Sequence, residues 1–163
     1  VKRFKDVKAQ TVKNQIKGQK LRMQSCLSWK MAQKKYKNLS PRIKIIQKLY
    51  NSLMNPDALI DYPKSQYKKL IKDVVTGTLE RSELIEMKIK SLIDNDIDLV
   101  KTDKLLKIIL FAAIFELMFK HNTPKNVIIN EYLLASEHFL EKIQIGYLNA
   151  ILDKIAKELR KES

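Results

Sequence analysis

Apolar residues recur at helical spacing along most of the chain, in segments that prolines separate. Ser40 followed by Pro41 supplies an N-cap and a proline at the first helical position. The apolar residues that follow at intervals of three and four predict a helix over roughly 41–55. Its buried stripe is expected to consist of Ile43, Ile46, Leu49, Tyr50 and Leu53.

A second amphipathic stretch begins after Ser65, which can cap it, and its apolar stripe continues past Gly77. The pattern alone does not decide whether Gly77 kinks one long helix or separates two helices. The expected stripe comprises Tyr67, Leu70, Ile71, Val74, Val75, Thr78, Leu84, Ile85, Ile89 and Leu92.

The stretch 104–119 is apolar on almost every side, which is typical of a central helix that other helices surround. It is too short to span a bilayer. Thr123 and Pro124 then start a helix that is expected to reach about Leu140. A last helix places Ile143, Tyr147, Leu148, Ile151, Leu152, Ile155 and Leu159 on one face. The sequence therefore predicts an all-α fold, a compact bundle of six or seven helices.

Composition agrees with a single helical domain. The chain has 163 residues, enough for one sizeable core, and only three glycines and four prolines to make turns between strands. Cys26 is the single cysteine, so it forms no internal disulfide, and no signal peptide is recognisable at the start. We therefore expect a cytoplasmic protein.

The net charge of +14 is unevenly distributed. Residues 1–40 contain twelve Lys/Arg and one acid, a net +11, whereas residues 41–163 contain twenty Lys/Arg and seventeen acids, a net +3. We expect 1–40 to be a basic extension, disordered or loosely helical, ahead of a helical domain over 41–163. Such an arm attracts nucleic-acid phosphates, or it is simply a solvated tail. Because Met31 begins a segment that reads like an ordinary N-terminus, the sequence leaves open whether 1–30 belong to the natural protein.

Residue patterns typical of metal sites and of enzymes are incomplete. The alternating aspartates of 94–98 resemble the start of an EF-hand loop, but Leu99 stands where that loop needs glycine. His121 and His138 have no partner at ligand spacing. A phosphate-cradling glycine loop and a nucleophile in a recognisable setting are also missing. We therefore predict no metal, no cofactor and no enzymatic activity.

Four segments together resemble a known family. They are Ile-Asn-Glu at 129–131, Asn-x-x-Leu-Asp-Lys at 149–154, the Arg-to-Leu-Tyr pattern over 42–50, and the helix segment 110–117 that ends in Phe-Glu-Leu. Their order and spacing are similar to those of the bacterial NusB transcription antitermination family. The resemblance covers about residues 41–160, and the two C-terminal motifs are the most specific.

The resemblance implies a fold of two packed helical subdomains and a function in RNA recognition without chemistry. The expected partners are the boxA element of the ribosomal RNA leader, the small-subunit ribosomal protein called NusE, and the RNA polymerase antitermination complex, with no role at a membrane. The self-association state stays open, a homodimer included.

The resemblance also suggests which residues meet RNA. Six positions are candidates, namely Lys34, Lys35, Lys37, Arg42, Gln47 and Tyr147. The three lysines stand where the family has an arginine-rich start. We favour RNA contact for Arg42 over a solvated charge at the helix start, because its planar donor fork suits a phosphate or a base edge. Gln47 and Tyr147 are equally compatible with base contact and with helix packing.

Six further positions are candidates for a structural or partner-binding role. Glu116, Asn130 and Glu131 are expected to be hydrogen-bonded residues that join helices. Asn149, Asp153 and Lys154 belong to the last motif, and the latter two are expected on the outward side of the final helix.

Two other functions remain as alternatives. The first is the RNA-binding front domain of a ribosomal RNA cytosine methyltransferase, an enzyme that needs a following cofactor-binding domain. The second is a helical scaffold whose basic arm meets anionic membranes or acidic proteins. Within the resemblance, Phe111, Glu137 and Gly146 replace basic residues of the family, so RNA affinity is expected to depend more on the N-terminal arm and on the protein partner.

Overall fold

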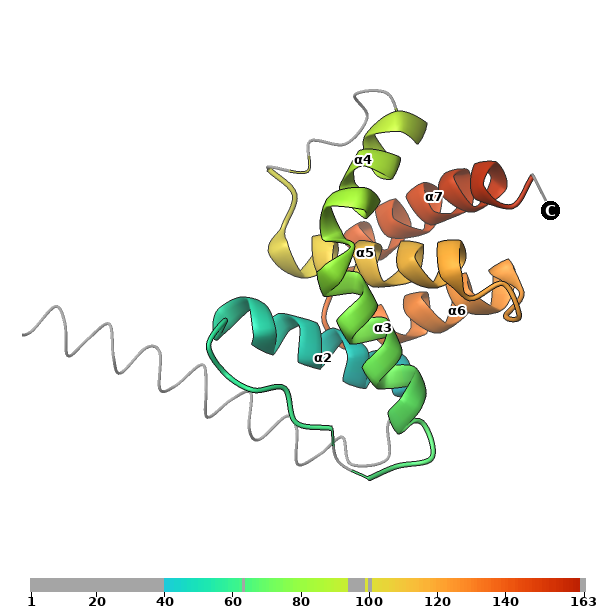
Figure 1. Cartoon of the computed structure of the whole chain (residues 1–163). Coiled ribbons are helices and arrows are strands. Elements are labelled where there is room, and N and C mark those ends of the chain that lie inside the picture. Colours follow the sequence, from blue (N-terminus) through green and yellow to red (C-terminus); the bar gives the residue numbers. More distant parts are fainter. Residues whose placement is uncertain (1–39, 63, 94–98, 100, 162–163) are drawn as a thin grey trace, which may run out of the picture. The chain divides into compact units, whose positions relative to one another are not determined.

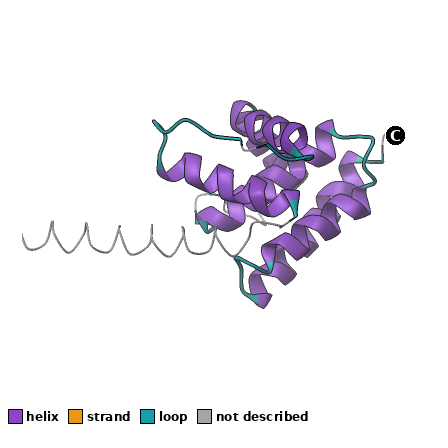
Figure 2. Ribbon diagram, turned by 90° about the horizontal axis from the view of Figure 1, so that it is seen from below, coloured by secondary structure: helices purple, strands orange, loops and turns teal. Residues whose placement is uncertain are grey.

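A computed structural model describes residues 40–62, 64–93, 99 and 101–161, and all regular structure within them is helical (Figures 1 and 2). The all-α prediction is confirmed for these residues. The predictions for 1–39 and for the aspartates of 94–98 lie outside them. The helices are α2 (Pro41–Met54), α3 (Lys68–Glu80), α4 (Ser82–Leu92), α5 (Lys104–Phe119), α6 (Lys125–Ser136) and α7 (Lys142–Leu159).

Helix α5 is the centre of the fold, as its apolar sequence predicts. It contacts each of the other five described helices, and Figure 1 shows it crossing α3 and α4. Residues 109–117 are all buried. Asp103 caps its first turn by accepting hydrogen bonds from the amides of Leu105 and Leu106 at 3.0 and 3.2 Å. The two expected subdomains therefore share one core through α5, and the chain from Ser40 on forms one compact unit.

Helix α2 begins as predicted and buries a wider face than predicted. The Ser40 hydroxyl accepts a hydrogen bond from the amide of Arg42 at 3.3 Å, and Pro41 is the first helical residue. Ile45 is fully buried outside the predicted stripe, because α2 packs against α3, α5 and α6 at once. Leu53, which the stripe includes, is 49% exposed at the last turn.

The chain between α3 and α4 breaks at Arg81, where φ is −111° and ψ is 20°, and not at Gly77. Gly77 lies inside α3 and faces α5, where a methyl group on its Cα would overlap the ring of Phe115. The predicted cap by Ser65 is wrong, since α3 begins at Lys68. Tyr67, the first residue of the predicted stripe, therefore precedes the helix and is 46% exposed.

Helix α6 ends at Ser136, earlier than the predicted Leu140, because residues 137–140 form a turn. A capping box starts α7: the amide of Glu141 donates to the side chain of Gln144 at 3.0 Å. The core face of α7 is formed by Leu148, Ile151, Leu152, Ile155 and Ala156. Ile143 and Tyr147 belong to the predicted stripe but are 85% and 41% exposed, so the stripe is too wide at its start.

Arg160 joins the end of α7 to the end of α5. Its guanidinium donates hydrogen bonds to the backbone carbonyls of Leu117 (3.0 Å), Lys120 (3.3 Å), His121 (3.4 Å) and Thr123 (3.5 Å). The last carbonyls of a helix have no hydrogen-bond partner within the helix. A cation placed there donates hydrogen bonds to them and is attracted by the negative end of the helix dipole. Periodicity gives no sign of this contact.

Within the described residues, no helix is both long enough and apolar enough to cross a bilayer. The same residues contain no group of three or more His, Cys, Asp or Glu side chains placed to hold a metal ion.

Candidate nucleic-acid interface

A buried polar network joins α2, α5 and α6. The Glu116 carboxylate on α5 is fully buried. One of its oxygens accepts a hydrogen bond from the Tyr132 hydroxyl at 2.7 Å, and the other accepts one from Arg42 Nη2 at 2.9 Å. Burying a carboxylate is costly unless it is paired and hydrogen-bonded, and Glu116 has both kinds of partner. The prediction that Glu116 is a partnered structural residue is confirmed.

Glu131 extends this network toward the surface. Its carboxylate lies 3.9 Å from Arg42 Nη1 and accepts a hydrogen bond from the Ser40 hydroxyl at 3.5 Å. The predicted bridge between helices is therefore confirmed for Glu131. Asn130 is exposed, and among the described residues no hydrogen bond joins its side chain to another helix.

Arg42 does not face solvent as the sequence suggests. Its side chain is 12% exposed, and the guanidinium points at Glu116. Burial by itself lowers the pKa of Arg42, but the charge and hydrogen bond of Glu116 outweigh it and raise the pKa above the ordinary value. Arg42 is therefore not the solvated helix-start charge that was the alternative to RNA contact. RNA contact by Arg42 stays a prediction, and it would require the ion pair to open.

Tyr132 makes the stability of this network depend on pH. Complete burial, then the neighbouring Glu116 carboxylate, raises the pKa of Tyr132 well above its ordinary value. Below about pH 10 the folded and unfolded chains both keep the phenol proton. Above it only the unfolded chain loses the proton, so the free energy of unfolding should fall by about 1.4 kcal/mol per pH unit from this group. Urea unfolding of the wild type and of Tyr132→Phe between about pH 9 and 11 measures this loss. The free energy of unfolding of the variant should fall less steeply with pH than that of the wild type. An equal fall in both proteins would contradict the role of Tyr132.

A hollow of about 620 Å³ opens where the end of α2 meets the starts of α5 and α7, and we call it the α2–α5–α7 hollow. Figure 1 shows these three helix ends on the same side of the molecule. Its lining residues are Tyr50, Met54, Thr102, Asp103, Lys104, Leu105, Phe139, Leu140, Glu141 and Gln144.

The α2–α5–α7 hollow combines aromatic, polar and charged side chains, and its lining contains one lysine and two acids. Tyr50 and Phe139 are aromatic, and Gln144 carries an amide. Lys104 is exposed at its edge. Single-stranded RNA is held in such places by base stacking on aromatic rings and by hydrogen bonds to base edges, while cations meet the phosphates. The arrangement can therefore accept an unpaired base.

Two of the predicted RNA-contact residues lie next to the hollow along their helices. Gln47 is half-buried and precedes Tyr50 by one turn on α2. Tyr147 is 41% exposed and follows Gln144 by one turn on α7. Their contact with RNA stays a prediction. Lys34, Lys35 and Lys37 lie outside the described residues.

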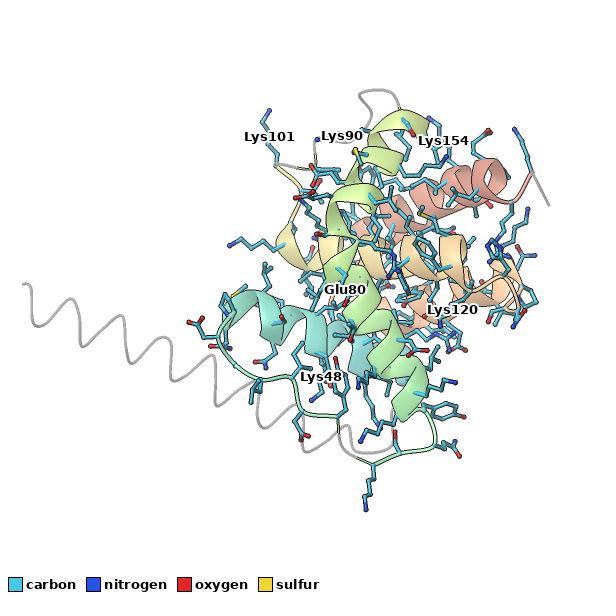
Figure 3. The ribbon with its side chains drawn as sticks, in the orientation of Figure 1. Lys48, Glu80, Lys90, Lys101, Lys120 and Lys154 are labelled. Atoms are coloured by element: carbon cyan, nitrogen blue, oxygen red, sulfur yellow. The ribbon has the colours of Figure 1, made fainter. Side chains whose placement is uncertain are left out.

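The outward residues of α7 are placed as predicted. Asp153 and Lys154 are both exposed, and Figure 3 labels Lys154 on this helix. Asp153 pairs with Lys157 one turn later at 2.7 Å. Asn149 is also exposed, which leaves it accessible to a partner.

The excess positive charge of the helical body lies in its first forty residues. Residues 41–80 contain seven Lys/Arg and four acids, a net +3, whereas residues 81–163 contain thirteen of each. Helices α2 and α3 and the connection between them therefore carry all of the body's net charge. Polyanion binding is expected on this side, because the field of a cationic patch attracts phosphates.

Sequence reasoning missed Lys104, Phe139 and Gln144 as site residues and assigned Tyr50 to the core. Tyr50 lies at the edge of its apolar stripe, and an amphipathic aromatic at such an edge could have been a signal. Lys104 is far from Phe139 and Gln144 in the sequence, and only the fold brings it next to them.

The described residues thus form an all-α bundle with an aromatic-lined hollow, and the net positive charge of the helical body lies over residues 41–80, which are features of helical nucleic-acid-binding domains. The sequence matches the model of the NusB family over residues 16–157, and the chain belongs to this family. The match begins upstream of the described helices.

Individual relatives agree with the family match. The transcription antitermination protein NusB of Rickettsia conorii is 34% identical over 122 residues, which cover 70% of this chain and 76% of that protein. The NusB of Rickettsia typhi is 38% identical over 112 residues, covering 64% and 70%. A solved structure of T. maritima NusB superposes with a TM-score of 0.63 at 21% identity, covering 72% of this chain and 89% of that one, which supports the fold.

The family defines the general activity. The chain is a transcription antitermination factor of the NusB type and not an enzyme. The relatives described above are named as antitermination proteins and not as methyltransferases.

Proposed function

We propose that the chain binds boxA-type single-stranded RNA of the ribosomal RNA leader, together with the small-subunit ribosomal protein NusE. Membership of the NusB family is the observation that carries this proposal, and the α2–α5–α7 hollow supplies a suitable place for the RNA. The complex would act in the cytoplasm on transcribing RNA polymerase, and would let it read through termination signals.

The hollow would hold one or more unpaired bases. Tyr50 and Phe139 offer rings for stacking, and Gln144, whose oxygen already accepts the amide of Glu141, offers its NH2 group as a donor to a base edge. Lys104 would meet a phosphate nearby. The lysines of 34–37 would add attraction that does not depend on the RNA sequence. Recognition therefore combines a specific hollow with a general cationic arm, and no bond is made or broken.

The test is a binding titration of the full chain with boxA-type RNA and with a scrambled RNA of equal length. It is carried out with and without NusE, over a series of salt concentrations. We expect a preference for boxA that increases when NusE is present. Equal and steeply salt-dependent binding of both RNAs, with no effect of NusE, would show only a cationic surface and contradict the proposal.

Tyr147→Leu is expected to weaken binding of boxA-type RNA by about tenfold, because base stacking on an aromatic ring contributes roughly 1–3 kcal/mol. Phe119→Leu is the matched control, since Phe119 is 40% exposed and Tyr147 is 41% exposed, and Phe119 lies at the opposite end of α5 from the hollow. Fluorescence anisotropy of labelled RNA measures both. An equal loss in the two variants would show that neither ring contacts the RNA specifically.

A further inference from the structure

The connection between α2 and α3 and the start of α3 carry cations and aromatic rings together. Residues 62–72 contain four lysines and two tyrosines and no acid. Within the described part of the chain, the side-chain ammonium groups of Lys64, Lys68, Lys69 and Lys72 make no ion pair or hydrogen bond. All four are exposed. Four adjacent cations without counter-charges repel one another, and a bound polyanion relieves this repulsion.

Helix α2 extends this surface. Lys48 lies over the ring of Tyr62, with its ammonium 6.0 Å from the ring centre, so the connection passes along this side of α2 (Figure 3). Lys44 lies one turn earlier on the same face of α2 and also has no ion-pair partner among the described residues. Tyr67 is 46% exposed between the lysines of the connection and those of α3. We call this set the α2–α3 basic surface, and it consists of Lys44, Lys48, Tyr62, Lys64, Tyr67, Lys68, Lys69 and Lys72.

The acids near this surface leave its charge positive. Asp57 and Asp61 lie in the same connection, and Asp73 on α3 pairs with Lys120 at 3.2 Å. The six lysines of the surface therefore outnumber the two aspartates nearby that have no ion-pair partner among the described residues.

The α2–α3 basic surface is separate from the α2–α5–α7 hollow. The hollow is lined by Tyr50 and Met54 at the end of α2, whereas Lys44 lies near its beginning. The fourteen residues of α2 span about 21 Å at 1.5 Å per residue. None of the residues that line the hollow belongs to the surface. A ligand that reaches both must therefore be long.

We infer that the α2–α3 basic surface is a second RNA-binding region, which holds single-stranded RNA flanking the segment in the hollow. The inference rests on the proposed function, since it extends the path of the same RNA. The chemistry is that of a sequence-tolerant single-strand binder: lysines track the phosphates, and the exposed ring of Tyr67 stacks on a base. This region gives length and affinity, and the hollow gives sequence preference.

The test compares the full chain with the triple variant Lys68→Gln, Lys69→Gln and Lys72→Gln. Exposed glutamines keep good helix propensity, so the fold should be retained. Three RNAs are titrated: a boxA-type oligomer, the same oligomer with uridine tails at both ends, and oligouridine alone. The wild type should bind the tailed RNA more tightly than the short one. The variant should bind the tailed RNA and oligouridine about tenfold more weakly, and the short RNA less than twofold more weakly. For the tailed RNA, the slope of log affinity against log salt concentration should become about 2 less steep.

Two further variants control for charge and for folding. The triple variant Lys88→Gln, Lys125→Gln and Lys157→Gln removes the same charge from α4, α6 and α7 and should leave the preference for the tailed RNA unchanged. Replacing Lys68, Lys69 and Lys72 by arginine should keep wild-type binding, because the cations remain. Equal losses for the short and tailed RNAs, or equal losses in the two glutamine variants, would overturn the inference.

The outcomes separate this inference from the proposed function. A boxA preference without any gain from the tails would leave the proposed function intact and overturn the second region. Oligouridine binding that depends on the three lysines, without a boxA preference, would support the second region and overturn the proposed function. Retention on anionic phospholipid vesicles that the triple glutamine variant loses, with RNA binding unchanged, would assign the surface to a membrane and overturn the inference.

Discussion

Glu116→Ala is expected to lower the free energy of unfolding by about 3–5 kcal/mol, the largest effect of any single change considered. The substitution removes the only fully buried carboxylate among the described residues. It leaves the guanidinium of Arg42 and the hydroxyl of Tyr132 without their shared partner, and a buried charge without a partner is strongly unfavourable. Urea unfolding followed by far-ultraviolet circular dichroism measures the change.

The control replaces the whole network by apolar side chains. Glu116→Leu combined with Arg42→Met and Tyr132→Phe should be much closer to the wild type than Glu116→Ala, since no buried polar group is left without a partner. Arg42→Met alone should be severely destabilising, because it leaves the Glu116 carboxylate without its cation. If Glu116→Ala cost less than about 1 kcal/mol, the network would not be needed for stability.

Gly77→Ala is expected to destabilise the fold by about 1–3 kcal/mol, although alanine is the better helix former. A methyl group at this position would overlap the ring of Phe115, which is itself 4% exposed and packed against Phe119. To make room, α3 and α5 must move apart or the ring must leave its position. Urea unfolding measures the effect.

Gly146→Ala is the matched control, because Gly146 also lies inside a helix. No atom lies within 4 Å of the position of its added methyl group, so the substitution should stabilise the protein by about 0.5–1 kcal/mol through helix propensity. Adding Phe115→Leu should recover part of the loss caused by Gly77→Ala. Stabilisation by Gly77→Ala similar to that of Gly146→Ala would show that the contact with Phe115 is not tight.

The helices could be predicted because their signals are local. Ser40 and Pro41 mark the start of α2, and the apolar run of 104–119 marks α5 as the central helix. The break between α3 and α4 could not be placed, because Gly77 is required by the approach of α5 and not by a bend of its own backbone. A glycine chosen for a tertiary contact looks the same in the sequence as one chosen for a turn.

The candidate site was predictable only in part. Glu116 could be identified as a paired residue because an acid in an apolar helix needs a partner, but neither Arg42 nor Tyr132 could be identified as that partner. Gln47 and Tyr147 came from the family resemblance. The hollow beside them is built from residues of α2, α5 and α7 that are far apart in the sequence, so no spacing rule could have assembled it.

The contact of Arg160 with the end of α5 has a consequence for synthesis of the protein on the ribosome. Its guanidinium closes onto the carbonyl of Leu117, which lies 43 residues earlier in the chain. The end of the nascent central helix therefore lacks this hydrogen bond, and its face toward α7 lacks the contacts of that helix, until the chain has been synthesised as far as residue 160. A chain that is released before α7 is complete would expose the apolar surface that α5 and α7 bury between them, and exposed surface of this kind favours aggregation.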